Sequence, residues 1–227
     1  MIANQAPPPL NKGALLIVLG VVLSVIFLMT PTQAYSLGRS VLQSGPVAMF
    51  ALYALFHPKG GRGRTLAVIL ALGAVGDFAI GQKFELGAAA FAVGHVIAIR
   101  YYWRNRRYNP APLVYGLMSL FMVAVVTTAE WLASGKTTAI GLGVYTLLVS
   151  GMAATALLSR FPRDVTGLGA VTFLCSDLLI FAAMGPLAQT QWVGPAIWMT
   201  YIAGQLLICC GVCGVLDRDE QRNTDIR

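Results

Sequence analysis

The sequence predicts an all-α membrane protein, a polytopic bundle of eight transmembrane helices with both termini in the cytosol. Of its 227 residues, 57% are hydrophobic and only 11% are charged, and the mean hydropathy is +0.71. Soluble globular domains carry about 25% charged residues, so this chain has too few charges to cover a surface that faces water. We therefore expect a single transmembrane domain over residues 1–227, with a short polar segment at 1–12 and a polar tail at 217–227.

Eight apolar segments are long enough, or nearly so, to cross about 30 Å of hydrocarbon at about 1.5 Å per residue. They lie near 14–30, 41–56, 65–81, 86–102, 112–129, 139–158, 167–184 and 194–216. The first segment and the stretch Pro31–Ala34 after it loosely resemble a secretory signal peptide with its cleavage site. The apolar run is long for such a signal, and its removal would leave seven spans without reorienting the others.

The distribution of Lys and Arg supports this number of spans. The loops on the N-terminal side hold 13 of these residues, whereas the opposite loops hold 3. A wrong span count would disturb this alternation, and an excess of Lys and Arg marks the cytosolic side. The net charge of +7 is therefore read as membrane topology, and no nucleic acid partner is expected. The tail alternates in sign and is expected to be solvated and partly disordered.

Two isolated acids, Asp77 and Asp177, lie inside the third and seventh apolar segments. A carboxylate at the centre of a membrane helix costs about 2.5–3.5 kcal/mol on insertion scales, so such residues are rarely kept without a function. A structural role, in which each acid only hydrogen-bonds a neighbouring helix, is the alternative. The recurrence of the pattern one hundred residues later favours a shared site.

Further polar side chains fall at the depth of the two acids. His95 lies about nine residues along the fourth segment, which runs from the outer side towards the cytosol. Tyr201 and Gln205 lie about seven and eleven residues along the last segment, which runs the same way. A face of the fourth segment carries Phe84, Gly87, Phe91 and His95, at spacings of three, four and four residues. Residues at these spacings share one side of a helix, so we expect the polar groups to face a common interior.

Paired acids in hydrocarbon fit more than one class of protein. A neutral acid beside an ionised one serves general acid catalysis with charge stabilisation opposite. The same acids could relay protons in a proton-coupled transporter of small solutes. Gly73-x2-Gly76-Asp77 also faintly resembles the motif of intramembrane aspartyl proteases, although the glycine spacing is one residue too long. A zinc hydrolase is disfavoured because His57 lies in a loop and only one histidine is buried.

Several motifs resemble those of the lysoplasmalogenase-like (YhhN) family of integral membrane proteins, in the same order and over roughly residues 40–210. They are Gly76-Asp77, Phe84-x2-Gly87-x3-Phe91-x3-His95, Tyr145 with Met152, Gly169-Ala170-x2-Phe173-x2-Ser176-Asp177, and Tyr201-x3-Gln205-Leu206. Two positions depart from the family pattern: Ala98 stands where tyrosine is expected, and Gly204 stands where alanine is usual. Both remove side-chain bulk and are expected to widen the pocket.

The resemblance implies a hydrolase that cleaves the vinyl ether bond of lysoplasmalogens to a fatty aldehyde and a glycerophospho-alcohol. Its substrate would be a membrane lysophospholipid, and no metal or other cofactor is required. If the chain is bacterial, the inner membrane is the expected location. We hypothesise that Asp77 and Asp177 share the roles of proton donor and stabilising carboxylate, with His95 as a third catalytic candidate. The expected supporting residues, which orient water, hold the carboxyls or line the pocket, are Tyr201, Gln205, Ser176, Phe84, Phe91 and Tyr145.

Overall fold

The computed structural model describes residues 12–30, 36–58, 61–133 and 139–225. These residues form an all-α bundle of eight helices: α1 Lys12–Met29, α2 Leu37–Phe56, α3 Arg64–Ile80, α4 Phe84–Arg104, α5 Pro112–Ala133, α6 Ala139–Leu158, α7 Leu168–Met184 and α8 Val193–Asp225. Each apolar segment expected from the sequence coincides with one of these helices. The segment 1–11 and the cleavage-like stretch Pro31–Ala34 lie outside the described residues.

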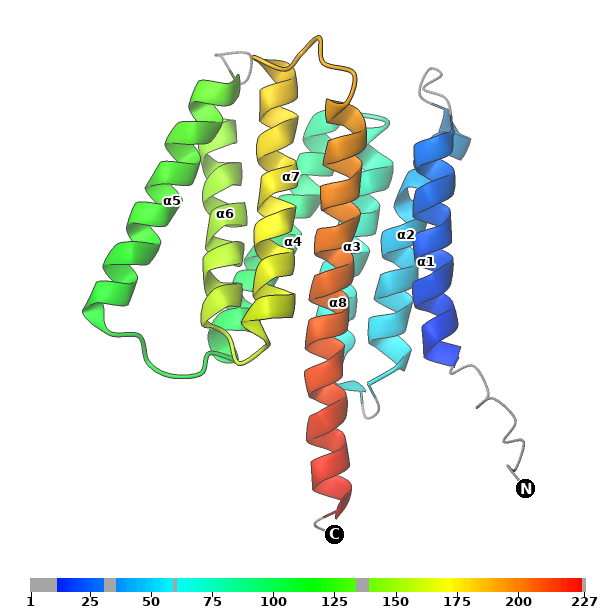
Figure 1. Cartoon of the computed structure of the whole chain (residues 1–227), viewed down its shortest axis with the longest axis vertical. Helices are drawn as coiled ribbons and strands as arrows, with labels where there is room; N and C mark the ends of the chain where they lie inside the picture. Colours follow the sequence, from blue (N-terminus) through cyan, green and yellow to red (C-terminus); the bar gives the residue numbers. More distant parts are fainter. Residues whose placement is uncertain (1–11, 31–35, 59–60, 134–138, 226–227) are drawn as a thin grey trace, which may run out of the picture.

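The helices run alternately up and down, and most sequence neighbours are also neighbours in space (Figure 1). α1 to α4 pack in order, each against the next, whereas α4 packs against α6 in the second half of the chain. α8 packs against α7 and returns to contact α1, α2 and α3. The last helix therefore closes the bundle, and α3 and α4 face α6, α7 and α8 across a shared interior.

The outer surface is that of a multi-pass membrane protein. Five of the described helices, α4 to α8, are long and apolar enough to cross a membrane, and α1 is a shorter apolar helix. α5 turns large apolar side chains outward, with Leu113 72% and Leu120 65% exposed. Soluble proteins rarely leave apolar patches of this extent open to water. The start of α1 and the end of α8 lie at the same end of the bundle (Figure 1), and the side of the membrane on which they lie stays a prediction.

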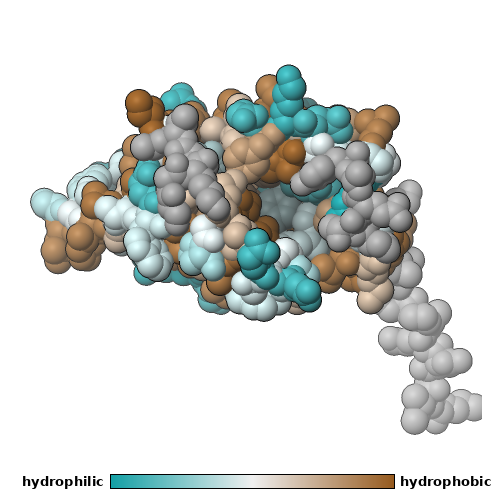
Figure 2. All heavy atoms as spheres, turned by 90° about the horizontal axis from the view of Figure 1, so that it is seen from above, coloured by the Kyte–Doolittle hydropathy of each residue, from teal (hydrophilic) through white to brown (hydrophobic). Residues whose placement is uncertain are grey.

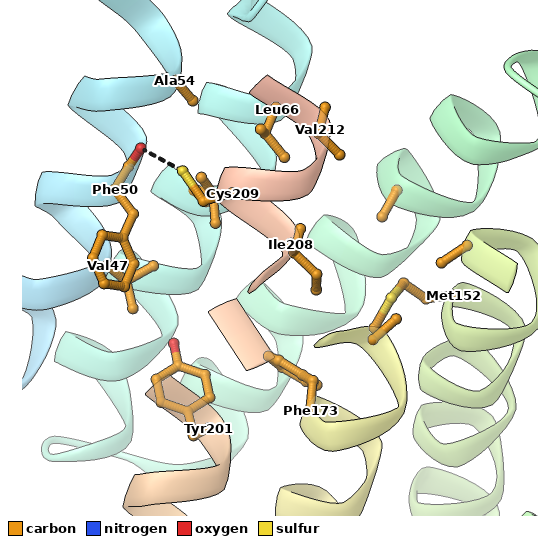
Figure 3. Close-up of a cluster of buried hydrophobic side chains, with 14 of the residues drawn as sticks. Val47, Phe50, Ala54, Leu66, Met152, Phe173, Tyr201, Ile208, Cys209 and Val212 are labelled. Carbon is orange, nitrogen blue, oxygen red and sulfur yellow. Dashed lines mark hydrogen bonds between the residues drawn. The ribbon is translucent and has the colours of Figure 1, made fainter. Parts of the chain in front are cut away.

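α8 forms the centre of the packed core (Figure 3). Its buried Cys209 lies beside α2, where the thiol donates a hydrogen bond to the carbonyl oxygen of Phe50 at 3.5 Å. Towards α7, the helix approaches closely at Gly204, because a Cβ atom there would lie 2.8 Å from the carbonyl oxygen of Gly169. Small residues allow such close contacts between membrane helices. This contact fixes the separation of α7 and α8 about one to two turns before Asp177 on α7.

The polar tail differs from the expectation. α8 continues as a helix to Asp225, so the prediction of a partly disordered tail is wrong for residues 217–225. Two side-chain contacts hold the extension to the bundle: Asp217 lies 3.2 Å from His57, and Asp219 forms an ion pair with Arg160 at 2.6 Å. Alternating charges are compatible with a helix when both signs find partners, and the sequence alone does not show those partners.

Candidate active site

A cavity of about 960 Å³ lies inside the bundle, between α3 and α4 on one side and α6, α7 and α8 on the other. Its wall includes Phe84 and Glu85 from the first turn of α4, so the cavity reaches the end of the bundle at which α4 begins. Seen from that end, the molecule is hollowed near its middle (Figure 2). Seven of the residues singled out from the sequence line this cavity: Asp77, Phe84, Phe91, Tyr145, Ser176, Asp177 and Tyr201.

Asp77 enters the cavity from α3, three residues before that helix ends. Its side chain is held from α8, since the hydroxyl of Tyr201 donates a hydrogen bond to Asp77 Oδ2 at 2.7 Å. Gln205 lies one turn further along α8, and its Nε2 donates to the Tyr201 oxygen at 3.4 Å. Asp77 itself is only 3% exposed. A chain of two hydrogen bonds therefore fixes this carboxyl against the last helix.

Asp177 reaches the same cavity from the middle of α7 and is 4% exposed. The hydroxyl of Tyr145, on α6, donates a hydrogen bond to Asp177 Oδ2 at 3.0 Å. The neighbouring Ser176 does not hold either carboxyl. Its hydroxyl donates to the backbone oxygen of Ile197 at 3.0 Å, so it ties α7 to α8 while still lining the cavity.

The charged groups on the cavity wall are all acidic. Among its described lining residues, Asp77, Glu85 and Asp177 are acids, and none is Lys or Arg. The rest of the wall is mainly aromatic and aliphatic, which is typical of a site for an apolar ligand with a few polar anchoring groups. Two carboxyls, each hydrogen-bonded through one oxygen to a tyrosine, can hold and transfer a proton at the apolar surface between them.

His95 does not line this cavity. It lies on α4 beyond Phe91, where it borders a separate void of about 30 Å³ together with Gln205. The imidazole is 5% exposed, packs edge-on against the rings of Tyr145 and Phe173, and its Nε2 has no hydrogen-bond partner among the described residues. The wall of this void is mostly apolar, and its size leaves room for a water molecule beside the imidazole. His95 and Gln205 thus line a different space from the two carboxyls, although Gln205 is linked to Asp77 through Tyr201, and Phe91 lines both spaces.

The two positions that depart from the family pattern have different effects. Ala98 borders the small void, so its missing bulk enlarges that void and not the large cavity. Gly204 borders neither space, and a Cβ there would lie 2.8 Å from the backbone nitrogen of Phe173. The expectation that both residues widen the pocket is therefore wrong, since Gly204 brings α7 and α8 together.

Four polar or aromatic side chains of the cavity wall were not singled out from the sequence: Gln43, Glu85, Phe181 and Trp198. Trp198 lies three residues before Tyr201 on α8, and its indole nitrogen donates to the backbone oxygen of Ser24 at 3.0 Å. That spacing is a signal that the sequence did contain, because residues three apart share a helix face. Glu85 directly follows Phe84, whereas nothing in the local sequence marks Gln43.

Fold and site together define a class: a polytopic all-α membrane protein with a pair of buried carboxyls in an internal cavity. Comparison with known families makes this more specific, because the model of the YhhN family matches residues 38–212. The chain belongs to the YhhN family. The matched range contains every residue proposed here for the site.

Two curated proteins are similar over most of their length. Both are named "Lysoplasmalogenase", one from Mycobacterium bovis and one from Mycobacterium tuberculosis. Each is 31% identical to this chain over 206 residues, covering 85% of this chain and 78% of the relative. No solved structure gives a significant match.

Proposed function

We propose that this protein is a membrane hydrolase that cleaves the vinyl ether bond of lysoplasmalogens and releases a fatty aldehyde and a glycerophospho-alcohol. The observation that carries this proposal is the pair of buried carboxyls, Asp77 and Asp177, on the wall of one largely apolar cavity. The names of the two similar mycobacterial proteins support the same reaction.

Vinyl ether hydrolysis needs a proton donor and a carboxylate in the same place. A protonated acid adds its proton to the alkene carbon remote from the ether oxygen, and an oxocarbenium ion forms. Water then adds to the carbon bonded to oxygen and loses a proton to a carboxylate, which gives a hemiacetal. The hemiacetal breaks its carbon–oxygen bond to yield the aldehyde and the alcohol, so protons taken up and released balance. General acid catalysis and charge stabilisation each contribute about 10²-fold or more.

One of Asp77 and Asp177 acts as the proton donor, and the other acts as the carboxylate. Tyr201 and Tyr145 each hold one oxygen of their carboxyl by a hydrogen bond, which leaves the other oxygen of each for the substrate or water. No lysine or arginine among the described lining residues would neutralise the acids. The surrounding apolar wall strengthens electrostatic stabilisation of a cationic intermediate, because the effective dielectric constant there is low.

The cavity suits a single-chain lipid. Its volume of about 960 Å³ lies at the upper end of the range of about 300–1,000 Å³ for ligand pockets. The apolar wall that extends inward to Phe91 offers a surface to an alkenyl chain, while Glu85 at the mouth suits a head group that carries an ammonium. For a bacterial source we further propose the inner membrane as the location.

The test is aldehyde release by the purified protein in detergent micelles. A 1-alkenyl lysophospholipid is compared with the 1-alkyl lysophospholipid that has the same head group and chain length. We expect aldehyde from the alkenyl lipid alone, because only its double bond can accept the proton. No aldehyde from either lipid, together with pH-gradient-driven solute flux in proteoliposomes, would instead support the transporter alternative.

A further inference from the structure

A second pocket, of about 420 Å³, lies at the opposite end of the bundle beside the extension of α8. Three arginines from separate segments border it: Arg62 before α3, Arg160 after α6, and Arg222 on α8. Asp219 is the one acid among its described lining residues. The sequence places this end on the cytosolic side, where Lys and Arg are concentrated. The pocket exists because α8 continues as a helix beyond the apolar core.

Arg160 is already held in place within this pocket. Its Nη1 lies 2.6 Å from Asp219 Oδ2, and its Nε donates to Asn105 Oδ1 at 3.1 Å. The charge of Asp219 is therefore matched. Arg62 and Arg222 have no carboxylate partner among the described residues. Two guanidinium groups without an ion-pair partner among the described residues therefore border a concave surface, beside a third that is fixed.

This arrangement matches the chemistry of a phosphate group. The planar guanidinium binds phosphate oxygens through paired hydrogen bonds, which makes arginine the preferred residue for phosphate recognition. Asn223 offers a neutral hydrogen-bonding group on the same wall, and buried Leu216 an apolar surface. Basic pockets between membrane helices on the cytosolic side bind anionic lipid head groups.

We propose that this pocket, bordered by Arg62, Arg160 and Arg222, binds a phosphate-bearing anion, either the head group of a membrane lipid or a soluble phosphate ester. The inference is independent of the hydrolase proposal. A purely topological role for these arginines needs only positive charge on one side of the membrane. It does not need three guanidinium groups from distant segments around one concavity.

The experiment compares two phosphomonoesters, phosphatidic acid in mixed micelles and glycerol 3-phosphate in solution, with phosphatidylcholine as the lipid control. Binding to the full chain is measured by native mass spectrometry and by the shift in thermal unfolding temperature, since a ligand of the folded state raises that temperature. The test variant is Arg62→Gln/Arg222→Gln. The matched control is Arg104→Gln/Arg218→Gln, which removes the same charge from two exposed arginines outside the pocket.

We expect at least one phosphomonoester to bind wild type and the control variant. We expect the test variant to bind it at least about tenfold more weakly, since it loses charge-assisted hydrogen bonds to the phosphate. Binding of phosphatidic acid alone identifies a lipid ligand, whereas binding of glycerol 3-phosphate identifies a soluble one. The proposal is overturned if neither compound binds, if phosphatidylcholine binds as well as phosphatidic acid, or if both double variants lose affinity equally.

Discussion

The two buried carboxyls share one cavity but depend on different parts of the fold. Asp77 is held by Tyr201, which lies 124 residues away on the helix that closes the bundle. Asp177 is held by Tyr145, which lies 32 residues away on the preceding helix. The Asp77 pair therefore joins the first half of the chain to the second, whereas the Asp177 pair lies within the second half. The site is complete only when α8 has packed against α3.

The largest effect is expected when each of the two carboxyls is removed in turn. Asp77→Asn and Asp177→Asn keep the shape of the side chain but abolish its acid chemistry. We expect each to lower the rate of aldehyde release by about 10²–10⁴-fold, the usual contribution of general acid or base catalysis. The initial rate with a saturating alkenyl lysophospholipid measures the loss.

A thermal unfolding curve of each asparagine variant provides the control for folding. The catalytic hypothesis is contradicted by variants that unfold at the wild-type temperature and release aldehyde at the wild-type rate. Loss in one variant alone would assign the chemistry to a single acid and leave the other a structural role.

Removing each tyrosine hydroxyl tests how much the hydrogen bond of each tyrosine–aspartate pair contributes to activity. Tyr201→Phe breaks the 2.7 Å bond to Asp77 and also deprives Gln205 of its acceptor. Tyr145→Phe breaks only the 3.0 Å bond to Asp177. Hydrogen bonds to charged groups are worth about 1.5–3 kcal/mol, so we expect losses in kcat of about 10- to 100-fold, the larger in Tyr201→Phe. Equal losses would show that the hydrogen bond from Gln205 adds nothing to the positioning of Asp77.

The spacing of α7 and α8 offers a test away from the cavity. Gly204→Ala places a methyl group 2.8 Å from backbone atoms of Gly169 and Phe173, and we expect it to lower stability by about 1–3 kcal/mol through overpacking. Gly94→Ala is the matched control, because its nearest neighbour would lie at 3.5 Å. Thermal unfolding measures both. A stable Gly204→Ala variant would mean that α7 can shift without cost.

The smallest effect is expected at His95. Its ring contacts Tyr145 and Phe173 edge-on but lies outside the cavity. Aromatic edge contacts are worth about 0.5–1.5 kcal/mol, so His95→Gln should lower kcat by at most about tenfold, through the position of Tyr145. A loss as large as that of the aspartate variants would show that His95 acts on the substrate directly. The kcat and KM values of the variant distinguish these outcomes.

Most of the fold could be predicted because each helix carries its own signal. Continuous apolar runs gave the eight helices, and the alternation of Lys and Arg gave their number independently. The continuation of α8 to Asp225 was missed because apolarity measures the length of a span and not the length of a helix. The partners that hold the extension, His57 and Arg160, lie far away in the sequence.

For the candidate site, the sequence predicted which residues line the cavity better than it predicted which space each side chain faces. Isolated polar residues in apolar runs pointed to Asp77, Asp177 and Tyr201, all of which line the cavity. Depth along a helix could not show that His95 and Gln205 face a different space. That division depends on which way the ring of one aromatic side chain points, and such a detail is set by packing between helices.

That aromatic side chain is Phe91, whose ring rests against α3 where Gly76 has no side chain. Its side chain lies between the large cavity and the small void, since it belongs to the walls of both. Trimming it to alanine would merge the two compartments and deepen the chamber towards Ala98 and Met152. For the lipid substrate proposed above, the Phe91 side chain would therefore limit how far a hydrocarbon tail extends into the bundle.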